Sequence, residues 1–361
     1  MENNPEFRVS PNPKIVPEAE RTRFLESPGF GRIFTDHMVT VTWDTGRGWH
    51  DAHVVERKPF QLDPASAVLH YAQEIFEGMK AYRTESGSIS LFRPEENARR
   101  FQRSAERLAM PRMPEELFLE AIEQLVRIDR EWIPSGDGSL YLRPFMFADE
   151  AFLGVRPANR YTFCVIASPV GAYFKGGAKP ITVWVSDTYS RAAPGGTGAA
   201  KCGGNYAASL IAQAEAAAKG CDQVVFLDAA ERQWVEELGG MNIFFVMADG
   251  TLVTPPLGTI LPGITRSSLI TLARDAGRKV EERAYSFTEW QNDAASGRLR
   301  EAFACGTAAV VAPIGTVRHA NGEFPIAGGE VGPVTRELSE ALVGIQRGTR
   351  ADPYGWLRMI A

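Results

Sequence analysis

Residues 194–206 read PGGTGAAKCGGNY, so Lys201 stands between small residues in a segment rich in glycine. Glycine lets the backbone approach a large, flat ligand closely. Partial desolvation lowers the pKa of a lysine amine and makes it a better nucleophile. The segment therefore indicates a chemically active lysine beside a bulky ligand. A solvated loop lysine is the alternative on these residues alone.

Two nucleotide-binding motifs can be tested on the same segment. A Walker A loop reads G-x-x-x-x-G-K-[ST], but counting from Gly195 the chain has Ala200-Lys201-Cys202 at the last three positions. The dinucleotide pattern G-x-G-x-x-G fails because Lys201 occupies its last position when it starts at Gly196. The sequence therefore does not favour a nucleoside-triphosphate hydrolase or a dinucleotide-binding enzyme.

Three further segments carry groups that suit a phosphorylated ligand. Residues 235–242 (VEELGGMN) place two carboxylates before a turn, and residues 261–266 (LPGITR) precede an expected helix, whose first N–H groups bind anions. Residues 305–309 (CGTAA) offer small residues and one hydroxyl. Each alone is also explained by a solvated turn, a capped helix or tight packing. Together with Lys201 they supply what pyridoxal 5′-phosphate requires, namely a Schiff-base lysine, an acid for the ring nitrogen and a phosphate site.

The composition is that of an ordinary globular protein. The chain has 361 residues, enough for about two domains, with 44% hydrophobic and 23% charged residues. A net charge of −5 gives no reason to expect nucleic acid or an anionic membrane as a partner. Four separated cysteines without a C-x-x-C pair indicate reduced thiols. With no metal motif, no targeting segment and no long apolar run, we expect a soluble, cytoplasmic protein.

Strand and helix patterns indicate an α+β first half and a mixed α/β second half. We expect a small N-terminal domain over residues 1–170, a glycine- and proline-rich linker over 171–180 and a larger cofactor-binding domain over 181–361. Helices are expected at 95–108, 114–132, 206–219, 265–276 and 334–346. Strands are expected within 32–54 and at 139–147, 161–167, 181–186, 223–228, 243–247 and 251–254.

Several motifs, in one order, resemble the branched-chain amino acid aminotransferases of fold type IV, within the class IV aminotransferases. The resemblance extends from Phe30 to Trp356. Its motifs are FG (30–31), FTDHM (34–38), FEGMKA (76–81), LFRP (91–94) followed by Asn97 and Arg100, SLYLRP (139–144), VGAYF (170–174), Lys201 with GGNY (203–206), Glu237 with Gly239, Met241 and Asn242, and LPG (261–263). It implies a small α+β domain and a larger mixed α/β pseudo-barrel domain.

The resemblance also implies roles for the residues that would hold pyridoxal phosphate. Lys201 would carry the cofactor as a Schiff base and move the proton between substrate and cofactor carbons. Tyr206 would hydrogen-bond the ring oxygen, and Glu237, rather than Glu236, would pair with the ring nitrogen. The phosphate would be bound by the Arg100 side chain, by the backbone N–H groups of Ile264 and Thr265 and by the Thr307 hydroxyl. Helical periodicity alone does not separate Arg100 from Arg99.

The expected substrate pocket must accept an apolar branched side chain in one half-reaction and the glutamate side-chain carboxylate in the other. By the resemblance it is lined by Phe30, Tyr71, Phe76, Tyr141, Arg143, Tyr173, Gly240, Met241 and Ala308. Aromatic walls suit the branched side chain, and Arg143 can meet the carboxylate. Leu153 and Val155 match a loop that reaches the neighbouring subunit's pocket in this family, which implies a homodimer.

The chain departs from some relatives at two places. Ala309 and Ala312 stand where those relatives have a C-x-x-C thiol pair, so thiol redox control is not expected there. Gly240 stands where some have a threonine, so the substrate carboxylate must rely on other hydroxyls and on backbone N–H groups such as that of Ala308.

The sequence thus predicts ping-pong transamination of leucine, isoleucine or valine with 2-oxoglutarate. A D-amino acid aminotransferase, an aminodeoxychorismate lyase and a non-catalytic relative that kept the fold are the alternatives. Arg143 and the long motifs argue against the first two, and the presence of both Lys201 and Glu237 argues against the third. The preferred substrate, the physiological direction and any assembly beyond a dimer stay open.

Overall fold

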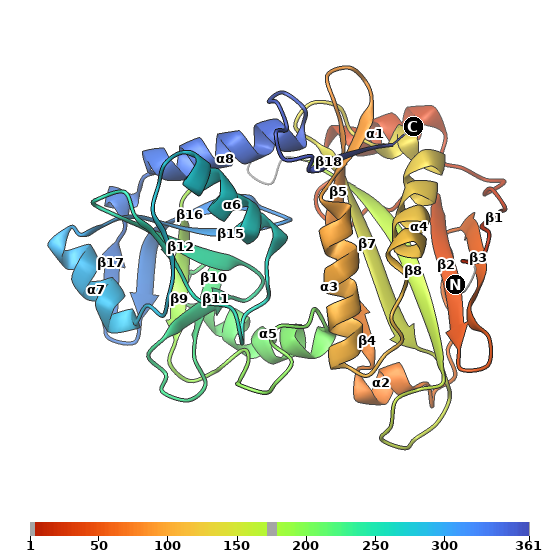
Figure 1. Cartoon of the computed structure of the whole chain (residues 1–361), viewed down its shortest axis with the longest axis horizontal. Coiled ribbons are helices and arrows are strands. Elements are labelled where there is room, and N and C mark those ends of the chain that lie inside the picture. The colour runs from red at the N-terminus through yellow and green to blue at the C-terminus, as the bar shows by residue number, and fades with distance from the viewer. Residues whose placement is uncertain (1–3, 172–178, 361) are drawn as a thin grey trace. The chain divides into compact units, whose positions relative to one another are not determined.

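The computed structural model describes residues 4–171 and 179–360. Its helices are α1 (Glu18–Glu26), α2 (Ala67–Tyr71), α3 (Pro94–Arg107), α4 (Glu115–Ile128), α5 (Gly203–Ala218), α6 (Ile264–Asp275), α7 (Phe287–Ser296) and α8 (Pro333–Gln346), with the 3-10 helices η1 (Arg130–Trp132) and η2 (Ala327–Gly329). They are labelled along the chain in Figure 1. In the described part of the chain, no helix is long and apolar enough to cross a membrane.

The contacts divide the described residues into two units. Unit 1 holds residues 4–171, 200–203 and 345–360, and unit 2 holds residues 179–199 and 204–344. The expected division places 200–203 and 345–361 in the C-terminal domain, whereas the contacts group 200–203 and 345–360 with unit 1. Strand β18 (Leu357–Ile360) pairs with β6 (Ile89–Phe92) of unit 1, and the main chain of Lys201 is hydrogen-bonded to Phe76 and Ser104. The expected linker at 171–180 lies mostly outside the described residues.

Unit 1 is built on a nine-stranded sheet with the order β1-β3-β2-β8-β7-β5-β6-β18, and β4 pairs with β7. Its remaining strands are β1 (Arg8–Val9), β2 (His37–Asp44), β3 (Gly48–Glu56), β4 (Glu74–Phe76), β5 (Met79–Arg83), β7 (Ser139–Ala148) and β8 (Arg160–Val170). Helices α3 and α4 lie side by side (Figure 1), and α4 contacts β2 and β8.

An aromatic cluster joins these helices to the sheet. The ring of Phe101 on α3 lies 5.2 Å from that of Phe118 on α4 and 5.6 Å from that of Phe163 on β8. All three side chains are fully buried, and each buried phenylalanine contributes about 1.5–3 kcal/mol by leaving water. The apolar stripes of α3 and α4 therefore fix their positions on the sheet.

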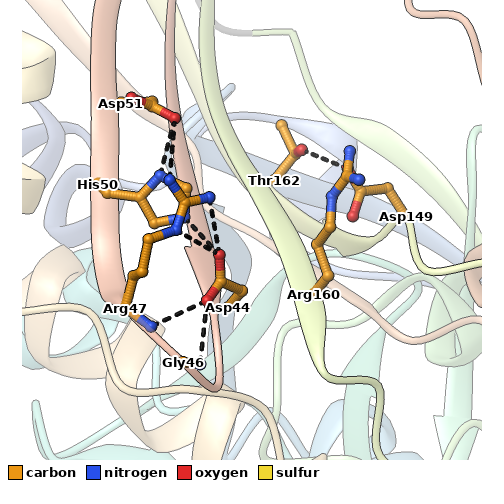
Figure 2. A network of polar contacts seen from close by, with 8 residues as sticks. All are labelled: Asp44, Gly46, Arg47, His50, Asp51, Asp149, Arg160 and Thr162. Carbon is orange, nitrogen blue, oxygen red and sulfur yellow. Dashed lines mark hydrogen bonds and ion pairs between the residues drawn. The ribbon is translucent and has the colours of Figure 1, made fainter.

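The hairpin of β2 and β3 ends in a polar network (Figure 2). The Asp44 carboxylate accepts hydrogen bonds from the backbone N–H groups of Gly46 and Arg47, and its Oδ2 lies 2.8 Å from His50 Nε2. His50 Nδ1 in turn lies 2.9 Å from Asp51, which occupies the left-handed region (φ 50°) at a bulge in the ladder. Asp tolerates this conformation, so the network fixes both the turn and the register of the hairpin.

Unit 2 is built on a second nine-stranded sheet with the order β11-β10-β9-β16-β15-β12-β13-β14, and β17 pairs with β16. The strands are β9 (Ile181–Ser186), β10 (Gln223–Leu227), β11 (Val235–Leu238), β12 (Asn242–Met247), β13 (Leu252–Thr254), β14 (Val280–Glu282), β15 (Leu299–Gly306), β16 (Val310–His319) and β17 (Gly322–Pro325). Parallel pairs at β9–β10, β9–β16 and β13–β14 mix with antiparallel ones. The predicted mixed α/β class is confirmed.

Helix α7 shows why unit 2 folds locally as it does. The Ser286 hydroxyl accepts the Glu289 N–H at its start, and Gly297 ends it in the left-handed region (φ 74°). These are the preferred residue types at the two ends of a helix. Between them, Trp290 is fully buried and its ring lies 5.0 Å from that of Phe245 on β12.

Candidate active site

The backbone of Lys201 is fixed on both sides within unit 1. Its N–H donates to Ser104 Oγ at 2.9 Å, and its C=O accepts the N–H of Phe76 at 2.9 Å. The side chain is half-buried, and Nζ lies 4.7 Å from the centre of the Phe76 ring. The chain therefore presents this amine at a defined place, beside an apolar wall that reduces its hydration.

The side chain of Glu74, on β4, contacts the start of α5, the helix that follows Lys201. Its carboxylate accepts the N–H of Gly203, and a Cβ at Gly203 would collide with that carboxylate. Burial raises the pKa of the Glu74 carboxyl, while the Gly203 N–H and the charge of Arg143 act in the opposite direction. A negatively charged group at a helix N-terminus is stabilised by the helix dipole, so Glu74 holds the segment that follows Lys201.

Arg100 and Arg99 are clearly separated by their surroundings. Arg100 is buried and donates from Nε and Nη2 to the two carboxylate oxygens of Glu77 at 2.8 and 2.7 Å. Asn97 Nδ2 donates to the same carboxylate at 2.7 Å. Burial acts to raise the pKa of Glu77, but the charges of Arg100 and Lys201 and these hydrogen bonds hold it below its ordinary value. Arg99 is half-exposed and pairs with Glu96 at 2.7 Å.

Four of the residues predicted to line the substrate pocket form one cluster in unit 1. The rings of Phe30 and Tyr141 meet edge to face at 5.1 Å. The Arg143 guanidinium carbon lies 4.8 Å from the centre of the Phe76 ring and 5.3 Å from that of Tyr141, and Arg143 Nη2 donates to the Tyr141 hydroxyl at 3.0 Å. The arrangement combines apolar walls with one stacked cation.

The remaining predicted pocket residues of unit 1 are held by other contacts, are exposed, or lie outside the described residues. Tyr71, at the end of α2, donates its hydroxyl to the Leu153 carbonyl at 2.5 Å. Leu153 and Val155 are 67% and 87% exposed, so they contribute to no core of the described residues. Tyr173 lies outside the described residues.

In unit 2, Glu237 is a buried carboxylate held by donors from three segments. Its Oε1 lies 2.7 Å from Arg191 Nη1 and accepts the Leu261 N–H at 3.0 Å, and its Oε2 accepts Asn242 Nδ2 at 3.2 Å. The neighbouring Glu236 differs, since it accepts from the Thr259 hydroxyl and burial raises its pKa. The ion-paired carboxylate is therefore Glu237.

Asn242 connects this carboxylate to the start of α6. Its Nδ2 also donates to the Leu261 carbonyl at 3.0 Å, and a Cβ at Gly263 would collide with its side-chain oxygen. Only glycine therefore allows the 261–263 segment to pass here. Helix α6 begins at Ile264 with no side chain capping its first N–H groups among the described residues. The backbone of Ile264 and Thr265 can thus bind an anion.

Two turns adjoin this carboxylate. The Leu238 N–H bonds to the Met241 carbonyl at 2.9 Å, and Asn242 pairs with Cys305 in the β12–β15 ladder. This register brings Gly240 and Met241 beside Gly306, where an added Cβ would lie 3.3 Å from Met241 Cγ. Thr307 and Ala308 follow in the turn between β15 and β16.

Tyr206 on α5 completes the group, since its ring lies 5.9 Å from the Arg191 guanidinium carbon. An added Cβ at Gly240 would lie 3.8 Å from Tyr206 Cε1. Within unit 2 the described residues thus include an acid, a phenol, a hydroxyl and a helix N-terminus, and within unit 1 an amine, two arginines and aromatic side chains. Groups of these kinds are the ones that pyridoxal-phosphate enzymes use.

The model of the family described as amino-transferase class IV matches residues 74–317, which is more than half of the chain. The chain belongs to the class IV aminotransferases. The match runs from Glu74 to Val317 and so includes Lys201, Arg100, Tyr206 and Glu237.

Curated relatives of this class IV aminotransferase extend over nearly its whole length. It is 58% identical over 360 residues to a probable branched-chain-amino-acid aminotransferase of Streptomyces coelicolor, covering 99% of both chains. It is also 58% identical over 358 residues to a branched-chain-amino-acid aminotransferase of Mycolicibacterium smegmatis, covering 98% of this chain and 97% of the relative.

Solved structures agree with the predicted fold type IV. A branched-chain amino acid aminotransferase of Escherichia coli has a TM-score of 0.74 at 31% identity, covering 89% of this chain and 99% of that one. The branched-chain amino acid aminotransferase of Thermobaculum terrenum, solved in its PLP-form, has a TM-score of 0.71 at 27% identity, covering 89% of this chain and 98% of that one.

Several residues of the site have no role in the sequence analysis. Glu77, Asn97 and Asn242 stand inside the motifs that carry the resemblance, so their presence there was the available signal. Ser104 and Arg191 stand in no motif. Each is revealed only by the fold, which brings Ser104 to the Lys201 backbone and Arg191 to Glu237.

Proposed function

We propose that this chain catalyses the reversible transfer of the amino group from leucine, isoleucine or valine to 2-oxoglutarate, with pyridoxal 5′-phosphate as cofactor. The observation that carries the proposal is the 58% identity, over 99% of both chains, to a probable branched-chain-amino-acid aminotransferase. The products are the branched 2-oxo acid and L-glutamate. The two half-reactions share one pocket in a ping-pong order.

The chain's own residues supply distinct parts of a pyridoxal phosphate site. The cofactor contributes, when bound, a ring that accepts electrons from the substrate α-carbon. The α6 N-terminus at Ile264 and Thr265, the Thr307 hydroxyl and Arg100 suit its phosphate. The ion-paired Glu237 suits its ring nitrogen and the Tyr206 phenol its ring oxygen.

Lys201 is the residue proposed to bind the cofactor and to move protons. Its amine would hold the cofactor by condensing with the cofactor's aldehyde, with release of water, and Nζ, when free again, would accept the substrate α-proton and give it back. The backbone bonds to Ser104 and Phe76 keep Nζ within reach during both steps.

The cluster of Phe30, Phe76, Tyr141 and Arg143 supports the acceptance of two kinds of side chain. A branched apolar side chain can lie against the three rings, because apolar contacts are non-directional. A glutamate side-chain carboxylate can instead bond to the Arg143 guanidinium and the Tyr141 hydroxyl, which already lie 3.0 Å apart. We assign the substrate α-carboxylate to two turns, the one that contains Gly240 and Met241 and the one that contains Ala308.

We also propose that the active form is a homodimer. Leu153 and Val155 are exposed apolar side chains on a loop held by Tyr71, and Leu210 and Ile211 on α5 are 66% and 56% exposed. Apolar side chains that are this exposed suit burial against a second copy. The 153–155 loop would reach the pocket of the neighbouring subunit.

Substitution of the lysine tests the function directly. In Lys201→Ala we expect the purified protein to lose the yellow absorbance of covalently bound cofactor and all transamination of L-leucine with 2-oxoglutarate. Lys279→Ala, at an exposed surface lysine paired with Glu281, should retain both. A fully active Lys201→Ala protein would contradict the proposal, and activity with D-alanine but not L-leucine would favour a D-amino acid aminotransferase.

A further inference from the structure

We propose that Arg191 is a positioning residue that fixes the charge and the orientation of the Glu237 carboxylate for the cofactor ring nitrogen. The inference deepens the proposed function and rests on it. Arg191 lies in the loop after β9, at residues 187–202, and its Nη1 lies 2.7 Å from Glu237 Oε1. The two side chains are only 2% and 3% exposed.

The Glu237 carboxylate is oriented through one of its oxygens. Oε1 receives both the Arg191 guanidinium at 2.7 Å and the Leu261 N–H at 3.0 Å, whereas the bond of Asn242 to Oε2 is longer, at 3.2 Å. The donors come from the 187–202 loop, from the segment before α6 and from β12. The two shorter bonds both reach Oε1, and that of Arg191 is the shortest of the three.

The surroundings of Arg191 favour this role over simple surface pairing. Nη1 also approaches the Gly198 carbonyl at 3.4 Å, and the guanidinium carbon lies 5.9 Å from the centre of the Tyr206 ring. Its Nε is buried and has no hydrogen-bond partner among the described residues. A buried arginine with an unsatisfied N–H is costly, so its position is explained by what it does for Glu237 rather than by its own hydrogen bonding.

The chemical consequence follows from charge. A buried carboxylate without a cation is driven toward its neutral form, but arginine stays protonated in proteins. Arg191 therefore keeps Glu237 ionised before the cofactor arrives. With the cofactor bound, the carboxylate would face two positive groups, so Arg191 would also limit how firmly Glu237 holds the proton of the ring nitrogen.

The test is a double-substitution cycle with three readouts. The proteins are wild type, Arg191→Met, Glu237→Gln and the double variant Arg191→Met/Glu237→Gln. For each, the cofactor dissociation constant, the visible absorption spectrum of the loaded protein and the urea midpoint of the cofactor-free protein are measured at one pH. Arg318→Met is the matched control, because Arg318 pairs with Glu323 at the surface of the same unit, at 2.7 Å.

Arg191→Met should weaken cofactor binding at least about tenfold, change the relative intensities of the visible bands and lower the urea midpoint of the cofactor-free protein. In the Glu237→Gln background, Arg191→Met should have a much smaller effect on the dissociation constant, the visible spectrum and the urea midpoint, because no buried carboxylate is left unpaired. Arg318→Met should behave as wild type.

Equal effects of Arg191→Met in both backgrounds, or an unchanged spectrum and dissociation constant, would overturn the inference. If Arg191→Met does not fold, recovery of folding in the double variant supports the coupling, and Arg191→Lys is compared in the two backgrounds. Arg191→Lys should bind cofactor more tightly than Arg191→Met because it keeps the charge. If no variant, wild type included, binds pyridoxal phosphate, the proposed function fails, and the urea midpoints still decide whether the two residues are coupled.

Discussion

At the scale of single residues, the predicted pocket depends on side chains that are missing as well as on those that are present. A Cβ at Gly78 would collide with the Tyr141 hydroxyl and lie 3.0 Å from Tyr141 Cζ. Tyr141 therefore occupies space that only glycine leaves open at position 78. The same hydroxyl accepts from Arg143, so Gly78 indirectly sets the position of the Arg143 guanidinium.

We expect Gly78→Ala to damage substrate binding more than folding. Tyr141 must turn away, which breaks its bond with Arg143 and its edge contact with Phe30. We expect kcat/KM to fall about tenfold or more with both L-leucine and L-glutamate, equivalent to about 1.4 kcal/mol. Steady-state kinetics of both half-reactions measures this. Gly46→Ala is the control, because its Cβ would meet only Asp44 Oδ1 at 3.4 Å, and similar kinetics for the two variants would refute the argument.

At the scale of elements, the start of helix α8 is held by a carboxylate on strand β15. Glu301 on β15 is 4% exposed, and its oxygens accept the N–H of Val334 at 3.0 Å and both the N–H and the hydroxyl of Thr335 at 2.8 and 2.7 Å. These N–H groups belong to the first turn of α8, where an anion is favoured. A Cβ at Gly332 would collide with the Glu301 side chain.

Glu301→Gln should therefore destabilise unit 2. The amide keeps the shape of the side chain but loses the charge and presents a donor where an acceptor is needed, which costs about 1–3 kcal/mol. Urea unfolding followed by circular dichroism gives the change. Glu340→Gln, at an exposed position of the same helix, should change the free energy of unfolding little, and an equal effect of the two substitutions would show that Glu301 is not an anchor.

The hairpin of β2 and β3 should lose stability in acid because of Asp44 (Figure 2). Although burial acts to raise it, hydrogen bonds from His50 and from Arg47 and Gly46 hold the pKa of Asp44 at about 2. An unfolded aspartate has a pKa of about 3.9. The stabilisation is thus fully present above about pH 4 and is lost as the pH falls through about 2.

We expect Asp44→Asn to be less stable than wild type near neutral pH and this difference to shrink as the pH falls below about 4. Urea midpoints of the two proteins, taken from about pH 7 to about pH 3, give the difference directly. Asp137→Asn replaces an exposed aspartate of the same unit as a control. A difference for Asp44→Asn that is constant over this range would contradict the assignment.

Elements with their own periodicity were predictable from the sequence, and elements defined by pairing were not. Helices α3, α4 and α6 lie within a few residues of their expected bounds because their apolar faces repeat with the helical period. The strands expected at 243–247 and 251–254 are likewise present, as the antiparallel pair β12 and β13. Strand β4 has three residues and β18 four, too few to show alternation, so each is recognised only by its partner strand. In α8, Val334 is half-buried, whereas Leu338, Leu342 and Ile345 are buried.

The residues of the candidate site likewise fall into those with a local sequence pattern and those found only through contacts distant in the chain. Glu237, Lys201 and Arg100 stand in spaced motifs, and the structure gives each a defined environment within its unit. Arg191 could not be found, because its contact with Glu237 spans 46 residues of chain and depends on the order of β9, β10 and β11 in the sheet. An ion pair of this kind leaves no local pattern.

At the scale of the whole molecule, the exposed loop at Leu153 and Val155 raises the question of which subunit it serves. Both side chains are exposed and so belong to no hydrophobic core of the described residues. The Tyr71 hydroxyl donates to the Leu153 carbonyl and so holds the loop in place. If the loop completes the pocket of a second copy, Val155→Asp should place a charge against an apolar substrate there. The variant protein should fold and dimerise but lose activity with L-leucine, because burying an unpaired charge is costly.

Mixing two inactive variants decides the point. Val155→Asp keeps Lys201, and Lys201→Ala keeps an intact loop, so a hybrid dimer contains one pocket with both features. Co-expressed in equal amounts, the two chains should form hybrids in about half of the dimers and recover about a quarter of wild-type activity. Each parent dimer alone should stay inactive. If the loop instead serves its own subunit, every pocket in the mixture carries one defect and no activity returns, which would refute the proposed exchange of loops between subunits.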